Sequence, residues 1–152
     1  MTEPVPPDDV LAVAQLLGRE PAGNFVVAIR RRNGRPMVIA NEPLLHDGTP
    51  MPTRYWLVDP EVRAQVSRLE SEGGVRQAEA AVGPDELAAA HARYAAERDA
   101  LVPSTWTGPR PSGGVGGTRR GVKCLHAHVA WWLAGGDDPV GDWTAGRIDL
   151  HR

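Results

Sequence analysis

The dipeptide Asn33-Gly34 constrains the fold more than any other feature of this sequence, because it separates two short segments of strand-forming residues. Residues 24–30 and 35–40 are rich in branched aliphatic side chains, which favour β-strands. Asn and Gly both adopt positive φ angles readily, so the pair is suited to a tight hairpin turn. The pattern predicts an antiparallel hairpin. Pro36 indicates that the second strand begins at a sheet edge or with an irregularity.

Other elements are predicted from helix caps and stop signals, with Asp59 suited to cap a helix that begins at Pro60. The expected elements are a helix from Asp8 or Asp9 to Leu17, a strand over 53–58, a helix from Pro60 to Gly73-Gly74, a helix from Pro84 to about Leu101, a helix from about Val122 to Gly135-Gly136, and a short helix or strand after Asp142. We expect a single α+β domain over 24–152, preceded by an N-terminal lead and short helix over 1–23. Its small antiparallel sheet should carry helices packed on one face.

Length and composition indicate a soluble cytoplasmic protein. The chain has 152 residues, of which 41% are hydrophobic, enough for one domain with a sizeable core. Its net charge of −2 gives no overall basic footprint, which argues against a nucleic-acid partner. A single cysteine excludes an intramolecular disulfide. The proline-rich N-terminus differs from a signal peptide, and no apolar run approaches the roughly 20 residues of a membrane helix.

Residues 113–128 are the best candidate site, because glycines, cationic side chains and metal-type ligands occur together there. Four of the first five residues are glycine, and they can expose backbone N–H groups at the start of a helix. Cationic side chains would add charge-assisted bonds to an anion, although neither the Walker pattern nor the dinucleotide-binding spacing is present. The alternative is a flexible loop that lets the last helix pack closely. The predicted ligand-binding residues are Gly114, Gly116, Gly117, Thr118, Arg119, Arg120 and Lys123.

Cys124, His126 and His128 are the candidate catalytic or metal-binding residues. On a regular helix Cys124 and His128 share a face, whereas His126 points about 200° away. The Cys124–His128 pair is therefore the candidate for a metal site, with an Asp, His46 or His91 completing a tetrahedron, although Cys-x-His-x-His is not a standard zinc spacing. Alternatively, Cys124 is a nucleophile with a histidine as base, or a buried cysteine packed beside a core histidine.

Several blocks of the chain resemble one family. Residues 114–130 read Gly-Val-Gly-Gly-Thr-Arg-Arg-Gly-Val-Lys-Cys-Leu-His-Ala-His-Val-Ala, and Asp-Pro-Val-Gly follows at 138–141. Residues 47–57 and Ser-Arg-Leu-Glu at 67–70 supply earlier blocks in the same order. This series resembles the DUF501 family from about Asn24 to Gly141. The resemblance implies a mainly bacterial, notably actinobacterial, family with no established biochemical activity, whose genes often lie near those for enolase, a septum-formation protein and an exopolyphosphatase.

The sequence departs from the family pattern in its cysteines. Many members carry a cysteine near the first hairpin, and some carry one in a Trp-Leu-x-Cys-Pro block. Here these places read Arg31-Arg-Asn-Gly34 and Leu57-Val-Asp-Pro60. A family metal site that used those thiols would lack them in this chain. Asp59 retains ligand oxygens, but its expected role as a helix cap accounts for it.

Together these features predict a cytosolic domain that binds, and in one version hydrolyses or transfers, a phosphate-bearing small ligand at the Gly113–His128 junction. The two arginines and the lysine would hold the anion, with His126 or His128 as proton-transfer groups. Two other classes stay open. One is a non-catalytic protein-interaction module linked to cell division, and the other is a metal-assisted hydrolase that uses Cys124 and His128. The sequence does not identify a cofactor.

Overall fold

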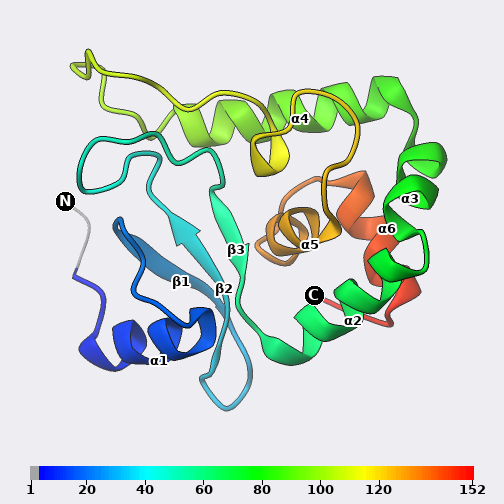
Figure 1. The fold of residues 1–152 in the computed structure, drawn as a ribbon, viewed down its shortest axis with the longest axis horizontal. Coiled ribbons are helices and arrows are strands. Elements are labelled where there is room, and N and C mark those ends of the chain that lie inside the picture. The colour runs from blue at the N-terminus through cyan, green and yellow to red at the C-terminus, as the bar shows by residue number, and fades with distance from the viewer. Residues whose placement is uncertain (1–3) are drawn as a thin grey trace.

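The computed structural model describes residues 4–152, so the first three residues of the predicted N-terminal lead lie outside the described residues. This part of the chain forms six α-helices, one short 3-10 helix and a three-stranded sheet (Figure 1). In chain order the elements are α1 (Pro7–Leu17), β1 (Phe25–Arg30), β2 (Pro36–Asn41), β3 (Tyr55–Leu57), α2 (Pro60–Ser71), α3 (Gly74–Val82), α4 (Pro84–Asp99), η1 (Val115–Gly117), α5 (Leu125–Leu133) and α6 (Pro139–Arg147).

The predicted hairpin is confirmed, but its turn is wider than a two-residue loop. β1 and β2 pair antiparallel, and the Arg31 N–H donates to the Arg35 carbonyl at 2.8 Å across the loop. Gly34 has a φ of 89°, as expected, whereas Asn33 does not adopt positive φ. The Asn33 side chain instead accepts the Arg35 N–H at 3.0 Å. Asn33 therefore stabilises the turn through its amide oxygen and not through its backbone conformation.

The strand order is β1-β2-β3, which places β2 in the centre of the sheet. Pro36 was predicted to mark either an edge strand or an irregularity at the start of the strand. The edge strand is therefore wrong, and the irregularity is confirmed. Pro36 is the first residue of β2, opposite Arg30, and the register shifts on either side of Ile29. A proline at the start of a strand removes no hydrogen bond from the middle of the ladder, so the central strand tolerates it.

The two faces of the sheet are covered by different parts of the chain, because successive residues of a strand point to opposite faces. Val38 and Ala40 of β2 belong to the larger core, which helices α2 to α6 complete. Ile39 lies in a second cluster with Val13 of α1, on the other face (Figure 1). The predicted α+β class, as a single domain with a small antiparallel sheet, is confirmed. Helix α1 adds a cover on the face opposite the main helical layer.

Aspartate side chains cap two of the helices, and one of these caps was predicted from the sequence. Asp59 accepts the Val62 N–H at 3.0 Å and caps α2, as expected. Asp138 accepts the Val140 N–H at 2.9 Å and caps α6, which begins at Pro139. The segment from Asp142, expected as a short helix or a strand, is therefore helical, and its helix starts earlier, at Pro139. In both places an Asp-Pro pair supplies the cap oxygen and a residue with a pre-set φ.

Two further helices differ from expectation. The Gly73-Gly74 pair ends α2, but the chain continues directly into α3, which was not predicted. Gly74 is buried, and a Cβ there would lie 2.7 Å from the Leu69 carbonyl oxygen, so the glycine permits a close contact between helices. The helix predicted from about Val122 starts at Leu125. Gly121 has a φ of 64° and Cys124 is extended, so the segment before Leu125 is not helical.

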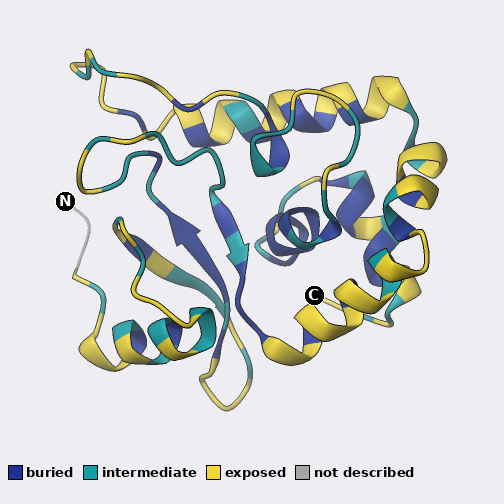
Figure 2. Cartoon of the chain, viewed as in Figure 1, coloured by how far each residue is buried: buried dark blue, intermediate teal, exposed yellow. Residues whose placement is uncertain are grey.

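Helix α5 forms the centre of the main core. Each of its residues is buried except His126 (Figure 2). Within the part of the chain that the structure describes, no helix has the length and apolar character needed to cross a bilayer.

Candidate functional site

The glycine-rich loop uses much of its own backbone hydrogen-bonding capacity. The Gly114 N–H donates to the Thr118 carbonyl at 2.8 Å, and the Gly117 N–H donates to the Gly114 carbonyl at 3.0 Å. Gly113, Gly116 and Gly117 all have positive φ, which glycine adopts without strain. Two of the four N–H groups expected to surround an anion are therefore occupied within the loop. The glycines therefore allow the backbone to fold into a compact loop.

His91 of α4 fastens this loop to the helical layer. The Val115 N–H donates to His91 Nδ1 at 3.1 Å, so Nδ1 is the acceptor nitrogen of the ring. His91 Nε2 then carries the proton and donates to the Gly121 carbonyl at 2.8 Å. Gly114 lies so close that a Cβ there would be 2.4 Å from His91 Cβ. With both ring nitrogens engaged, His91 holds the loop and does not complete a metal site.

Arg119 and Arg120 line a pocket of about 400 Å³ between α3, α4 and the loop. Both arginines are exposed, and within residues 4–152 neither pairs with a carboxylate. Glu79 also lines the pocket, and its carboxylate accepts the Val122 N–H at 2.9 Å. The structure thus brings together two of the three predicted cationic residues at one cavity.

The other predicted ligand-binding residues do not line this pocket. Lys123 is exposed and lies outside its wall. The Thr118 hydroxyl is buried and has no hydrogen-bond partner among the described residues. Gly114, Gly116 and Gly117 belong to the loop that contacts α4 but not to the pocket lining. Of the predicted ligand-binding residues, Arg119 and Arg120 are therefore the two that line the pocket.

Cys124 and His126 meet Glu70 at the N-terminal end of α5. A carboxylate oxygen, the thiol sulfur and a ring nitrogen all lie within 4.8 Å of one another. Glu70 comes from the last turn of α2, and Cys124 precedes α5 with φ −147° and ψ 157°. The expected face shared by Cys124 and His128 was wrong, because the helix begins one residue after the cysteine. The extended cysteine instead meets His126.

Hydrogen bonds shift the titration of this pair. Burial raises the pKa of the Cys124 thiol, but hydrogen bonds with His126 and with the Ala127 N–H outweigh burial and hold the pKa below its usual range. The bond with Cys124 raises the pKa of the His126 imidazole, burial opposes this, and the charge of Glu70 adds to the rise. Both shifts favour a thiolate beside an imidazolium, a form that suits nucleophilic attack. Metal binding also uses the thiolate, but it requires that His126 lose its proton.

His128 lies apart from this cluster. Its Nδ1 is 2.7 Å from Asp138 Oδ2, and both side chains are almost completely buried. Of the residues expected to complete a metal site, neither His46 nor His91 belongs to the Cys124 cluster. Glu70 was missed because it lies 54 residues before Cys124, on a helix face that resembles an ordinary solvated one.

A family model described as "Protein of unknown function (DUF501)" matches residues 27–146. The chain belongs to the DUF501 family. The resemblance seen in the sequence is thus confirmed, and the matched range of this DUF501 protein includes Glu70, Cys124 and His126. Neither a curated protein nor a solved structure matched the chain.

The resemblance led us to expect cysteine in other family members at two places, and in this protein those two places are joined by an ion pair. Arg31, in the hairpin, forms two hydrogen bonds to the Asp59 carboxylate, at 2.6 and 2.7 Å. An ion pair therefore occupies these positions. Asp59 and Glu70 stand at opposite ends of α2, roughly 16 Å apart along the helix axis. A thiol at the position of Asp59 would thus not reach the Cys124 cluster.

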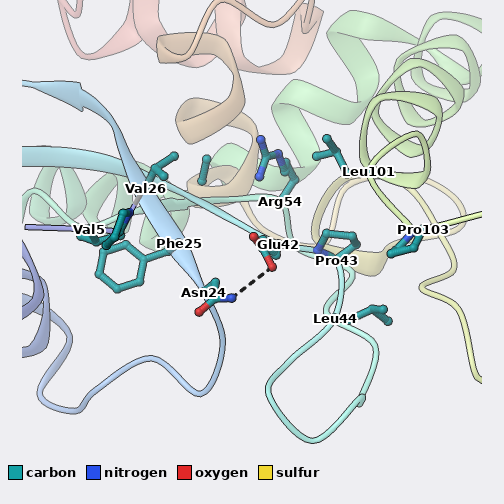
Figure 3. Close-up of a pocket in the computed structure, with 12 residues that line it drawn as sticks. Val5, Asn24, Phe25, Val26, Glu42, Pro43, Leu44, Arg54, Leu101 and Pro103 are labelled. Atoms are coloured by element: carbon teal, nitrogen blue, oxygen red, sulfur yellow. Dashed lines mark hydrogen bonds between the residues drawn. The ribbon is translucent and has the colours of Figure 1, made fainter. Parts of the chain in front are cut away.

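A second cavity of about 580 Å³ lies beside β1 and the segment that follows β2 (Figure 3). Its wall is mostly apolar, with Leu101 and Pro103 contributed by the segment after α4. Arg54 also lines it. The Arg54 Nη1 donates to the Asn41 carbonyl at 2.6 Å, while its Nε is buried without a partner among the described residues. The lining residues come from well-separated parts of the sequence, so no motif predicted this cavity.

Proposed function

We propose that this DUF501 protein is a cytosolic domain that binds a phosphate-bearing small ligand in the pocket between α3, α4 and the glycine-rich loop. The observation that supports the proposal is the presence of Arg119 and Arg120 at one cavity, with no carboxylate pairing either of them in residues 4–152. An arginine fork matches the oxygens of a phosphate group and can bind it bidentately. The cytosolic location agrees with a single cysteine, which forms no intramolecular disulfide.

The charge balance of the pocket favours an anion. Glu79 is the acidic residue of the lining, so two guanidinium groups face one carboxylate. The Glu79 carboxylate accepts the Val122 N–H, and this hydrogen bond holds the carboxylate close to the loop. Leu87 and Ala88 supply an apolar side to the same pocket. A ligand with a phosphate group and a small organic body fits this combination better than inorganic phosphate alone.

His128 has no proton-transfer role in the binding that we propose. This residue is 1% exposed and bonded to Asp138, so it does not contact a ligand in the pocket. His126 belongs to the Cys124 cluster and does not line the pocket. Hydrolysis or transfer at this cavity would need groups other than His126 and His128.

Thermal unfolding with a panel of phosphate compounds tests the proposal, with pyrophosphate and nucleotides as probes. A ligand at about 100 times its Kd adds about 2.7 kcal/mol of stability, which corresponds to a rise in Tm of roughly 5–10 °C for this chain length. Arg119→Glu with Arg120→Glu should remove the rise. Arg32→Glu, an exposed arginine in the hairpin turn, is the matched control and should keep it. An equal rise in the double variant, or no rise with any probe, contradicts the proposal.

A further inference from the structure

The side chains of Glu70, Cys124 and His126 supply three different metal-ligating atoms at one point. In a tetrahedral zinc site, bond lengths of about 2.0–2.3 Å place neighbouring ligand atoms roughly 3.3–3.7 Å apart. His126 Nδ1 and Glu70 Oε1 are already 3.3 Å apart. All three ligand atoms lie within 4.8 Å of one another, so only small side-chain movements would bring them around one ion.

The remaining polar atoms of two of these side chains are held by neighbours. Glu70 Oε2 accepts the Leu125 N–H at 2.7 Å, which leaves Oε1 directed at His126. His126 Nε2 lies 3.2 Å from the Ser67 hydroxyl, which leaves Nδ1 on the side of Glu70. Metal-ligating histidines usually bond through their second nitrogen to such a partner, which fixes the tautomer and the ring orientation. The cluster thus has the outer hydrogen bonds of a metal site.

The backbone also directs the cysteine toward this point. Cys124 has an extended backbone immediately before α5. His126 follows two residues later, and the other residues of α5 are buried. Glu70 joins α2 to α5, because its carboxylate accepts the N–H of Leu125, the first residue of α5. A cysteine, a histidine and a carboxylate are all zinc ligands. The site stays accessible, because the side chains of Glu70 and His126 are 24% and 28% exposed.

We propose that Glu70, Cys124 and His126 bind a divalent transition-metal ion of the zinc type, with solvent as the fourth ligand. Three protein ligands and one open position are typical of catalytic zinc sites, whereas structural sites use four protein ligands. A metal-bound solvent molecule at this position would be accessible from outside the protein. This metal site is separate from the proposed ligand pocket, since none of the three residues lines that pocket.

The test uses full-length protein that has been stripped with a chelator and then reloaded with Zn²⁺ or Co²⁺. Elemental analysis should find close to one ion per chain, and the Co²⁺ form should show a sulfur-to-metal absorption band. Cys124→Ser should abolish this band. Competition with a chromophoric chelator should show at least about 100-fold weaker binding in His126→Ala, and roughly 10- to 100-fold weaker binding in Ser67→Ala. His46→Ala, an exposed histidine outside the cluster, should bind normally.

Glu70→Gln provides a second variant, because it keeps an oxygen for the Leu125 N–H while removing the charge. It should fold and bind the ion more weakly. Substoichiometric metal in folded protein, absence of the sulfur band, or unchanged affinity in both His126→Ala and Glu70→Gln would overturn the inference. The Arg119→Glu and Arg120→Glu variant should bind the ion normally, so the two proposals fail independently.

Discussion

His128 Nδ1 lies 2.7 Å from Asp138 Oδ2, and this buried contact joins α5 to the start of α6. The other oxygen of Asp138 accepts the Val140 N–H at 2.9 Å and caps α6. Asp138 therefore satisfies two groups that would otherwise lie unpaired in the core. The histidine that the sequence offered as a metal ligand or proton-transfer group instead connects two helices.

Removal of the Asp138 side chain should destabilise the protein strongly. Asp138→Ala loses a helix cap and leaves His128 buried without its partner, which together cost about 2–4 kcal/mol of unfolding free energy. Urea unfolding followed by circular dichroism measures the change. His151→Ala is the control, because His151 and Asp149 are 3.0 Å apart but 85% and 95% exposed. The control should change stability by less than about 0.5 kcal/mol, and equal effects in the two variants would refute this account.

The ion pair of Asp59 should make stability depend on pH in the acid range. Burial raises the pKa of Asp59, but hydrogen bonds from Arg31 and the Val62 N–H outweigh it and hold the pKa below its ordinary value of 3.8. A carboxyl group whose pKa is lowered by folding stabilises the protein above its unfolded pKa. That contribution is lost as the pH falls through the folded pKa.

Asp59→Asn should therefore lower the unfolding free energy at neutral pH and reduce its decline toward acid. The amide keeps an oxygen that can cap α2, so the variant removes mainly the charge. Urea titrations of both proteins at several pH values between about 2 and 7 measure the difference. Curves that stay parallel over this whole range would show that Asp59 contributes nothing to acid sensitivity.

Two glycines of α6 should respond oppositely to alanine. No atom lies within 4 Å of a Cβ built on Gly146, so Gly146→Ala should stabilise the helix by about 0.5–1 kcal/mol. A Cβ on Gly141 would lie 2.4 Å from Trp132 Cβ and 2.8 Å from the His128 carbonyl oxygen. Gly141→Ala should therefore cost about 1–3 kcal/mol. Differential scanning calorimetry compares the two, and a shift of the same sign in both would contradict the packing of α6 on α5.

His91 should control the order of the glycine-rich loop. His91→Ala removes the acceptor for the Val115 N–H and the donor to the Gly121 carbonyl, at a cost of about 1–3 kcal/mol. We expect faster amide hydrogen exchange at Val115. We also expect the variant to lose the rise in Tm that phosphate ligands cause, because the neighbouring arginines are no longer held in place. The exposed His46→Ala variant is the control for both measurements. Unchanged protection at Val115 would show that the loop holds its shape without the imidazole.

The sequence by itself determined the elements whose signals are local. The strands around Gly34 and the helix that follows Asp59-Pro60 were predictable, because a turn glycine and an N-cap act within a few residues. The DUF501 blocks identified the family for the same reason, since they are contiguous in the chain. The candidate segment was also recognised by its unusual side chains, although their partners were not.

Only the tertiary structure decided which of those side chains lie together. Cys124 and His128 would share a face if the helix began earlier, but Gly121 and an extended cysteine delay its start to Leu125. Glu70 joins Cys124 from 54 residues away because α2 packs beside α5 in one core. Residue spacing encodes neighbours within a helix, whereas packing of separate helices depends on the whole apolar pattern. For that reason the sequence identified the segment, and the fold determined which of its side chains meet.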